Sequence, residues 1–127
     1  MNRIEIFNKY DGKCAYSSKE LSDDWQIDHI IPKSKTLQSF HKITNHNDKD
    51  NLVPCKSIIN HYKRGYDLEQ FRQYMLTFHL RLAKLPKNPR TDKTKKRIIY
   101  MNTIAELFDI TIDKPFDGVF YFEKLEQ

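Results

Sequence analysis

Two adjacent polar residues, Asp28 and His29, interrupt a largely apolar segment that ends at Pro32. The segment from Trp25 to Ile31 has the aromatic and β-branched residues typical of a strand, and a proline ends a strand because it has no amide hydrogen to donate. Side chains alternate between the two faces of a regular strand. Asp28 and His29 can therefore act on one substrate only where the strand twists, bulges or ends.

Two further motifs follow this pair along the chain. The stretch Asp50-Asn51-Leu52-Val53-Pro54 lies about twenty residues after His29, and Asn60-His61-Tyr62-Lys63 comes next. An isolated Asp-His pair is usually incidental, but the three motifs in this order and at these intervals are far more specific. Together they resemble the HNH endonuclease family, whose ββα-metal (His-Me finger) core cuts phosphodiester bonds.

The resemblance implies a catalytic role for each of four matching residues. His29 would be the general base, since an imidazole suits proton removal near neutral pH. Asp28 and Asn60 would be oxygen ligands of one metal ion. Asn51 would accept a hydrogen bond from the other imidazole nitrogen and fix the ring, a duty that a backbone carbonyl could share. An Asp and an Asn as ligands favour Mg²⁺, with Mn²⁺ as a possible substitute.

Basic and hydroxyl-bearing residues near these motifs are expected to contact the nucleic-acid backbone. Beside the motifs they are Lys33, Ser34, Lys35, His61, Lys63 and Arg64. A second group lies in the segment 84–97, which carries a net charge of +6 while the whole chain carries +5. The nucleic-acid-binding residues expected there are Lys93, Lys95, Lys96 and Arg97. A solvated loop and helix start would be the simpler explanation of this basic segment.

A structural zinc site is not expected, although many HNH domains bind zinc through two Cys-x-x-Cys pairs. Here Cys14 is followed by Ser17, and Cys55 is followed by Ile58 or Ile59 in the place of a second cysteine. At least two of four ligands are therefore missing, and a structural zinc ion needs four. We expect apolar packing to hold these loop ends together instead.

The expected fold class is α+β, with a ββα-metal core, additional flanking helices and a short C-terminal strand. The chain of 127 residues suits a single domain, 1–127, with the core at 10–65 and a helical extension at 66–127. The expected strands of the core are 13–17 and 25–31, followed by a polar connection at 36–50 and a helix at 54–64 that starts at a proline and ends before a glycine. The other expected elements are helices at 2–10, 68–85 and 94–108 and a strand at 119–122.

Local patterns support the long helix of the extension. Asp67 and Gln70 have the spacing of a capping box at its start. Apolar residues then recur at helical spacing and predict one core-facing stripe. The stripe consists of Phe71, Met75, Phe78, Leu82 and Leu85.

The sequence predicts a cytoplasmic protein that has no membrane segment. Two cysteines are few for a secreted domain of this size, no apolar signal segment follows Met1, and no apolar run approaches the roughly 18 residues of a spanning helix. The expected partner is DNA, most simply double-stranded. Because one active site cuts one strand, a double-strand break would need a homodimer or two encounters.

Metal-dependent hydrolysis of DNA that leaves 5′-phosphate and 3′-hydroxyl ends is the function that these features predict. Two alternatives use the same fold: a catalytically silent nucleic-acid-binding module, and a nuclease subunit that needs a partner. A third is an interaction protein that binds another protein through residues 65–127. Binding without metal-dependent cutting would favour the silent module.

Overall fold

The computed structural model describes residues 3–31 and 49–126. Six α-helices, one short 3-10 helix and one pair of antiparallel strands lie within these ranges, which makes the fold α+β. The chain forms two compact units. The first comprises Met1–Phe71 and Phe120–Gln127, and the second comprises Arg72–Val119.

The sheet of the first unit consists of β1 (Gln26–His29) and β2 (Leu52–Cys55) in antiparallel register, with Asp28 opposite Val53. The expected strand at 25–31 is thus confirmed in a shorter form. The expected strand at 13–17 is wrong: Lys13 forms only an isolated bridge with Glu20, and a turn follows. The partner of β1 is instead an apolar run in which every residue is buried.

Pro54 lies inside β2 and does not start a helix, so the expected helix at 54–64 begins later than predicted. The amide of Ile30 donates to Asn51 O at 2.9 Å, so Ile30 and Asn51 are a hydrogen-bonded pair of the ladder. Hydrogen-bonded pairs alternate with non-hydrogen-bonded ones, so Pro54, opposite Ile27, occupies a position that needs no amide hydrogen. Its carbonyl accepts the Ala15 amide at 2.9 Å and so links β2 to the preceding turn.

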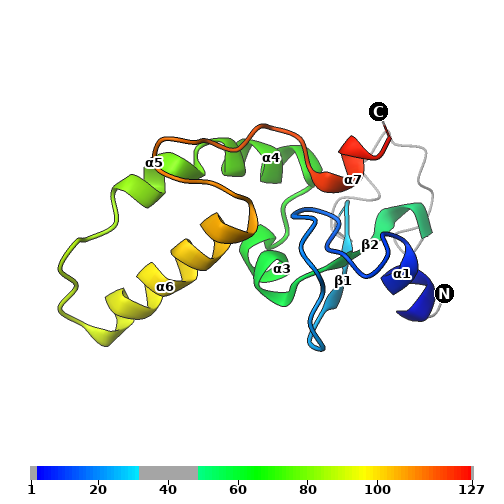
Figure 1. Cartoon of the computed structure of the whole chain (residues 1–127), viewed down its shortest axis with the longest axis horizontal. Coiled ribbons are helices and arrows are strands. Elements are labelled where there is room, and N and C mark those ends of the chain that lie inside the picture. Colours follow the sequence, from blue (N-terminus) through cyan, green and yellow to red (C-terminus); the bar gives the residue numbers. More distant parts are fainter. Residues whose placement is uncertain (1–2, 32–48, 127) are drawn as a thin grey trace. The chain divides into compact units, whose positions relative to one another are not determined.

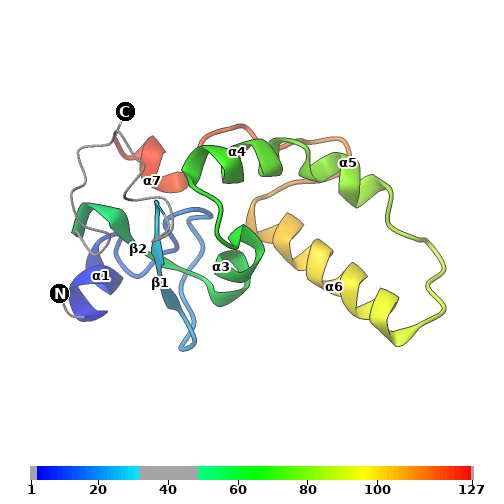
Figure 2. The same cartoon turned by 180° about the vertical axis from the view of Figure 1, so that it is seen from behind.

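Two helices flank the strand pair. Helix α1 (Arg3–Asn8) packs against β2, and α3 (Ser57–Lys63) packs against β1. Figures 1 and 2 show them on opposite sides of the two strands. The Lys9 ammonium, just after α1, donates to Leu52 O at 2.9 Å and to Lys49 O at 3.0 Å. It thereby fixes the short helix η1 (Lys49–Asn51) and the start of β2.

The C-terminal segment returns to the first unit as a short helix, α7 (Tyr121–Lys124), so the expected strand at 119–122 is wrong. The Phe120 amide donates to Glu123 Oε1 at 2.9 Å, a side-chain cap that favours a helical turn. Phe120 and Phe122 then pack edge-on against Tyr16, with ring centroids 5.2 and 6.1 Å away. Phe71 completes this aromatic cluster, 5.5 Å from Tyr16 and 5.2 Å from Phe120.

The helix expected at 68–85 is interrupted at Thr77 and forms α4 (Leu68–Leu76) and α5 (Phe78–Ala83). The Thr77 hydroxyl donates back to Tyr74 O at 3.2 Å, and the Arg81 guanidinium donates to the same carbonyl at 2.6 Å. Both bonds compete with the helical amide for that acceptor. The predicted capping box is confirmed, because Gln70 N donates to Asp67 Oδ1 at 2.8 Å and Asp67 N donates to Gln70 Oε1 at 3.1 Å.

In the second unit, α5 packs against α6 (Asp92–Leu107), which begins two residues before the expected position. Figure 1 shows the extended connection between the two helices, coloured yellow-green. The Thr91 hydroxyl accepts the Thr94 amide at 3.1 Å and caps α6. The buried residues of this unit include Met75, Phe78, Leu82, Met101, Ile104, Ala105, Ile110 and Phe116.

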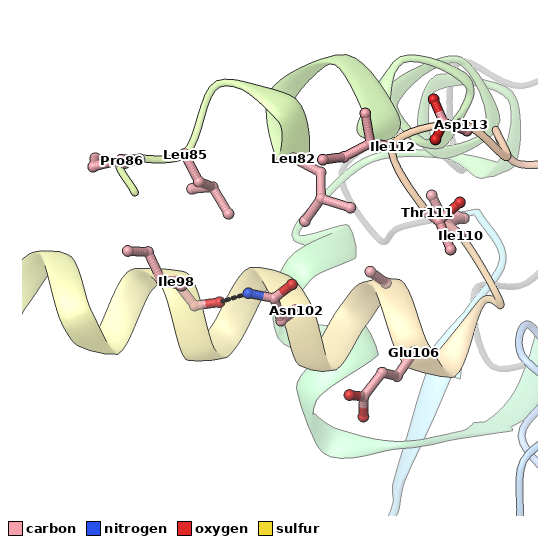
Figure 3. A pocket seen from close by; sticks show the side chains of 11 residues that line it. Leu82, Leu85, Pro86, Ile98, Asn102, Glu106, Ile110, Thr111, Ile112 and Asp113 are labelled. Carbon is pink, nitrogen blue, oxygen red and sulfur yellow. Dashed lines mark hydrogen bonds between the residues drawn. The ribbon is translucent and has the colours of Figure 1, made fainter. Parts of the chain in front are cut away.

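A pocket of about 560 Å³ lies within the second unit. Figure 3 shows the side chains of Leu82, Leu85 and Ile98 on its walls, and the Asn102 amide bonded to Ile98 O of its own helix at 2.9 Å. None of the expected site residues lines this pocket. In the described part of the chain, every helix falls short of the length and apolar character that a bilayer crossing requires.

Candidate active site

The end of β1 positions the Asp-His pair. Gln26 and Asp28 share one face of the strand because side chains alternate. Asp28 is buried, whereas His29 is half-buried and is the last residue of β1. His29 thus lies at the end of the strand, one of the places where both side chains could serve one substrate.

Asp28 is held by two neighbours through a single oxygen. The Tyr16 hydroxyl donates to Asp28 Oδ2 at 2.6 Å, and Lys63 Nζ lies 3.2 Å from the same atom. Asp28 Oδ1 accepts no hydrogen bond from the described residues. Burial, followed by the nearby Asp28 charge, raises the pKa of Tyr16 well above its ordinary value, so this hydroxyl keeps its hydrogen and acts as the donor.

Lys63 lies in the interior and not at the surface that a phosphate contact would need. Only 1% of it is exposed. Besides the ion pair with Asp28, its ammonium donates to His29 O at 3.0 Å and to Tyr66 O at 2.9 Å. All three hydrogens of the ammonium therefore have acceptors within the chain. Lys63 joins the end of α3 to the end of β1.

Asn60 lies one turn before Lys63 on α3 and contacts the same side of β1 as Lys63 does. Its Nδ2 donates to Gln26 Oε1 at 2.6 Å. Because Asn60 and Lys63 are three residues apart on the helix and Gln26 and Asp28 are two apart on the strand, the two contacts run side by side. Asn60 and Asp28 thus come from facing elements, and Asn60 Oδ1, like Asp28 Oδ1, accepts no hydrogen bond from residues 3–31 or 49–126.

Asn51 is fully buried and binds the backbone directly after His29. Its Oδ1 accepts the Ile31 amide at 2.8 Å, its Nδ2 donates to Ile31 O at 3.0 Å, and its own carbonyl accepts the Ile30 amide at 2.9 Å. These three bonds fix where the chain leaves β1. Contact of Asn51 with the imidazole itself stays a prediction.

The remaining expected nucleic-acid contacts fall in three places. Lys33, Ser34 and Lys35 lie outside the described residues. His61 and Arg64 are exposed on and just after α3. Lys93, Lys95, Lys96 and Arg97 are exposed in the first two turns of α6 in the second unit. Their roles in binding stay predictions.

Cys14 and Cys55, the two cysteines of the sequence, come together in the first unit. Burial works to raise the pKa of Cys14, but hydrogen bonds from Cys55, Ser17 and Lys56 outweigh it and lower that pKa to about 6. Burial and the bond to Cys14 raise the pKa of Cys55 well above its ordinary value. Both thiols are free and fully buried. Ile59 is also buried and Ile58 is half-buried, and neither side chain has a donor atom for a metal ion.

Two residues of the site, Tyr16 and Gln26, were not identified from the sequence. Gln26 could have been found from its spacing, since it lies two residues before Asp28 on the same strand face. Tyr16 carries no such local signal, because its position near Asp28 depends on the aromatic cluster. Within the described ranges, no group of three or more His, Cys, Asp or Glu residues is placed to hold a metal ion.

Comparison with known proteins adds no further assignment. The chain matches no protein-family model, no curated protein and no solved structure.

Proposed function

We propose that this chain is a metal-dependent endonuclease of the HNH, or ββα-metal, type that hydrolyses DNA phosphodiester bonds. The observation that carries the proposal is the pairing of β1 with α3, in which the Gln26–Asn60 bond runs beside the Asp28–Lys63 ion pair. The order of β1, β2 and α3 along the chain agrees with the order of elements in a ββα core.

A divalent ion fits the donor groups at this position. Asp28 and Asn60 each keep a side-chain oxygen that accepts no hydrogen bond within the described part of the molecule, while the other atom of each group is held. Carboxylate and amide oxygens suit Mg²⁺ or Mn²⁺. When bound, such an ion stabilises negative charge on the phosphate and on the leaving 3′ oxygen.

His29 acts as the general base in this proposal. It removes a proton from the water molecule that attacks phosphorus. Departure of the 3′ oxygen then leaves 5′-phosphate and 3′-hydroxyl ends. Asn51 contributes by fixing the backbone at Ile30 and Ile31, directly after the catalytic imidazole. A displaced backbone would move the imidazole away from the attacking water, and small displacements lower rates strongly.

The exposed basic residues supply affinity for the phosphate backbone. Lys93, Lys95, Lys96 and Arg97 form no ion pair within the described residues. Lys93 and Lys95 lie in the first turn of α6, where the helix dipole is positive and cations are unfavourable, and Lys96 and Arg97 follow in the second turn. A polyanion would remove this unfavourable charge, so we propose that the N-terminal half of α6 contacts DNA phosphates.

A catalytically silent DNA-binding module is the second candidate, and the Asp28–Lys63 ion pair favours it. A buried carboxylate that already has a cation at 3.2 Å is neutralised without a metal ion. Binding through α6 would be the same in both cases. Metal-dependent cleavage separates the two functions.

The test is conversion of supercoiled plasmid by the full chain in Mg²⁺, Mn²⁺ or EDTA. The nuclease predicts nicked plasmid with either metal and none with EDTA. Replacement of His29 by Ala lowers the rate by at least about 100-fold, because the general base is lost. The matched variant His79→Ala, in the second unit, keeps the parental rate. Linear product formed without a nicked intermediate would indicate two cooperating active sites, as in a homodimer.

Cleavage by His29→Ala at the parental rate would exclude His29 as the base. An inactive parent that still shifts DNA in a salt-dependent way would support the silent module.

A further inference from the structure

Tyr16 and Gln26 hold the two side chains on which the proposed metal site depends. Tyr16 donates to Asp28 Oδ2, and Gln26 accepts from Asn60 Nδ2, each at 2.6 Å. Each bond engages one atom of a terminal group and leaves Oδ1 for another partner. We propose that Tyr16 and Gln26 are positioning residues that set the affinity of the site for a divalent ion, an inference that rests on the proposed function.

The Tyr16 hydroxyl is held in place by packing on its ring. Tyr16 is buried and makes edge contacts with Phe71, Phe120 and Phe122. The backbone at Tyr16 and at the preceding residue is also fixed, since Tyr121 N donates to Tyr16 O at 3.2 Å and Phe122 N donates to Ala15 O at 2.8 Å. A rigid donor at 2.6 Å from a carboxylate makes a strong charge-assisted bond and fixes the plane of that carboxylate. The C-terminal segment thereby supports the orientation of Asp28.

Gln26 does the same for Asn60 at the surface. Gln26 is exposed at the first position of β1, and Asn60 is half-buried on α3. The amide group of Asn60 can rotate by 180° and exchange its oxygen and nitrogen. In the arrangement that the structure has, the bond from Nδ2 to Gln26 Oε1 holds the Asn60 amide so that Oδ1 is the atom left without a bond from the described residues. Without Gln26, part of the population would present a nitrogen, which cannot bind the ion.

Lys63 differs from both positioning residues because it carries charge. Its ammonium shares Asp28 Oδ2 with Tyr16 and also binds two backbone carbonyls. Replacing it would change the charge of the site and the fold together. Tyr16→Phe removes one oxygen atom and keeps the ring, and Gln26→Ala changes an exposed side chain. These two variants therefore test positioning with little disturbance of folding.

The experiment measures Mn²⁺ binding to the full chain by electron paramagnetic resonance, below the thermal unfolding transition of every variant. We expect Tyr16→Phe to raise the Kd for Mn²⁺ about tenfold, the effect typical of groups that orient a metal ligand. Gln26→Ala should raise it roughly threefold, since its bond is exposed to water. The matched controls are Tyr10→Phe, whose hydroxyl has no hydrogen bond within the described residues, and Gln73→Ala, on the exposed side of α4. Both should keep the parental Kd.

Two outcomes would overturn the inference. One is a Kd for Tyr16→Phe and Gln26→Ala within twofold of the parent, even if their melting temperatures fall, because a purely structural role changes stability alone. The other is a parent that binds no Mn²⁺. A parent that binds Mn²⁺ but does not nick plasmid would refute the proposed nuclease, and the Kd ratios would still decide the inference.

Discussion

Lys63 in the first unit and Lys96 in the second show how differently one residue type can be used. Lys63 is buried, and its ammonium has a carboxylate and two carbonyls as partners. Lys96 is exposed on α6, among three other cations and without an ion pair in the described part of the chain. Burial requires a charge to be paired, whereas exposure lets a charge stay available for another molecule. Lys63 therefore supports the fold, and Lys96 is suited to binding.

The largest expected effect is the difference in the free energy of unfolding between variants of these two lysines. Lys63→Met should lower the free energy of unfolding by about 3–5 kcal/mol, because it leaves the buried Asp28 carboxylate without its cation. Lys96→Met should leave it unchanged within error. Urea unfolding of both variants, followed by circular dichroism, measures the difference. Equal stability of the two variants would show that the Asp28–Lys63 pair contributes little to the fold.

Asn51 and Asn60 provide a second contrast between interior and surface. Asn51→Ala should destabilise the first unit by roughly 2–4 kcal/mol, since it leaves the buried Ile31 amide and carbonyl without partners. Asn60→Ala should cost little stability but weaken Mn²⁺ binding. Thermal unfolding with and without Mn²⁺ measures both effects. The assignment of Asn60 as a ligand would be wrong if Mn²⁺ raised the melting temperature of Asn60→Ala as much as that of the parent.

The smallest effect concerns the basic half of α6. A variant with Lys93, Lys95, Lys96 and Arg97 all replaced by Gln should bind duplex DNA more weakly. The slope of log binding constant against log salt should become shallower by about 3–4, one unit for each lost phosphate contact. Lys114→Gln, an exposed lysine of the same unit, is the control. An unchanged slope would remove α6 from the binding surface.

Features with local causes were predictable from the sequence. The capping box of Asp67 and Gln70 and the strand that carries Asp28 follow from neighbouring residues alone. The second strand was missed because Leu52–Cys55 pairs with residues far away along the chain, and Pro54 equally suits a helix start. The helix α7 was missed because its aromatic residues are typical of a strand. The side-chain cap from Phe120 N to Glu123 Oε1, which favours a helical turn, was not anticipated.

The site was predictable to the extent that its residues share a motif. Asp28 and Asn60 come from facing elements in the structure, as the resemblance implied. The buried position of Lys63 could not be predicted, because a lysine at the end of a helix is expected at the surface unless the groups that accept its hydrogen bonds are known. Tyr16 was also out of reach, since only the packing of Phe71, Phe120 and Phe122 brings its hydroxyl to Asp28.

The most direct measurement is the number of Mn²⁺ ions bound by the parent and by Asp28→Asn and Asn60→Ala. If Asp28 and Asn60 hold the catalytic ion, the parent binds one ion per chain, each variant binds it more weakly, and plasmid nicking falls in parallel. Parental binding in both variants, or no binding by the parent, would contradict a metal site between β1 and α3.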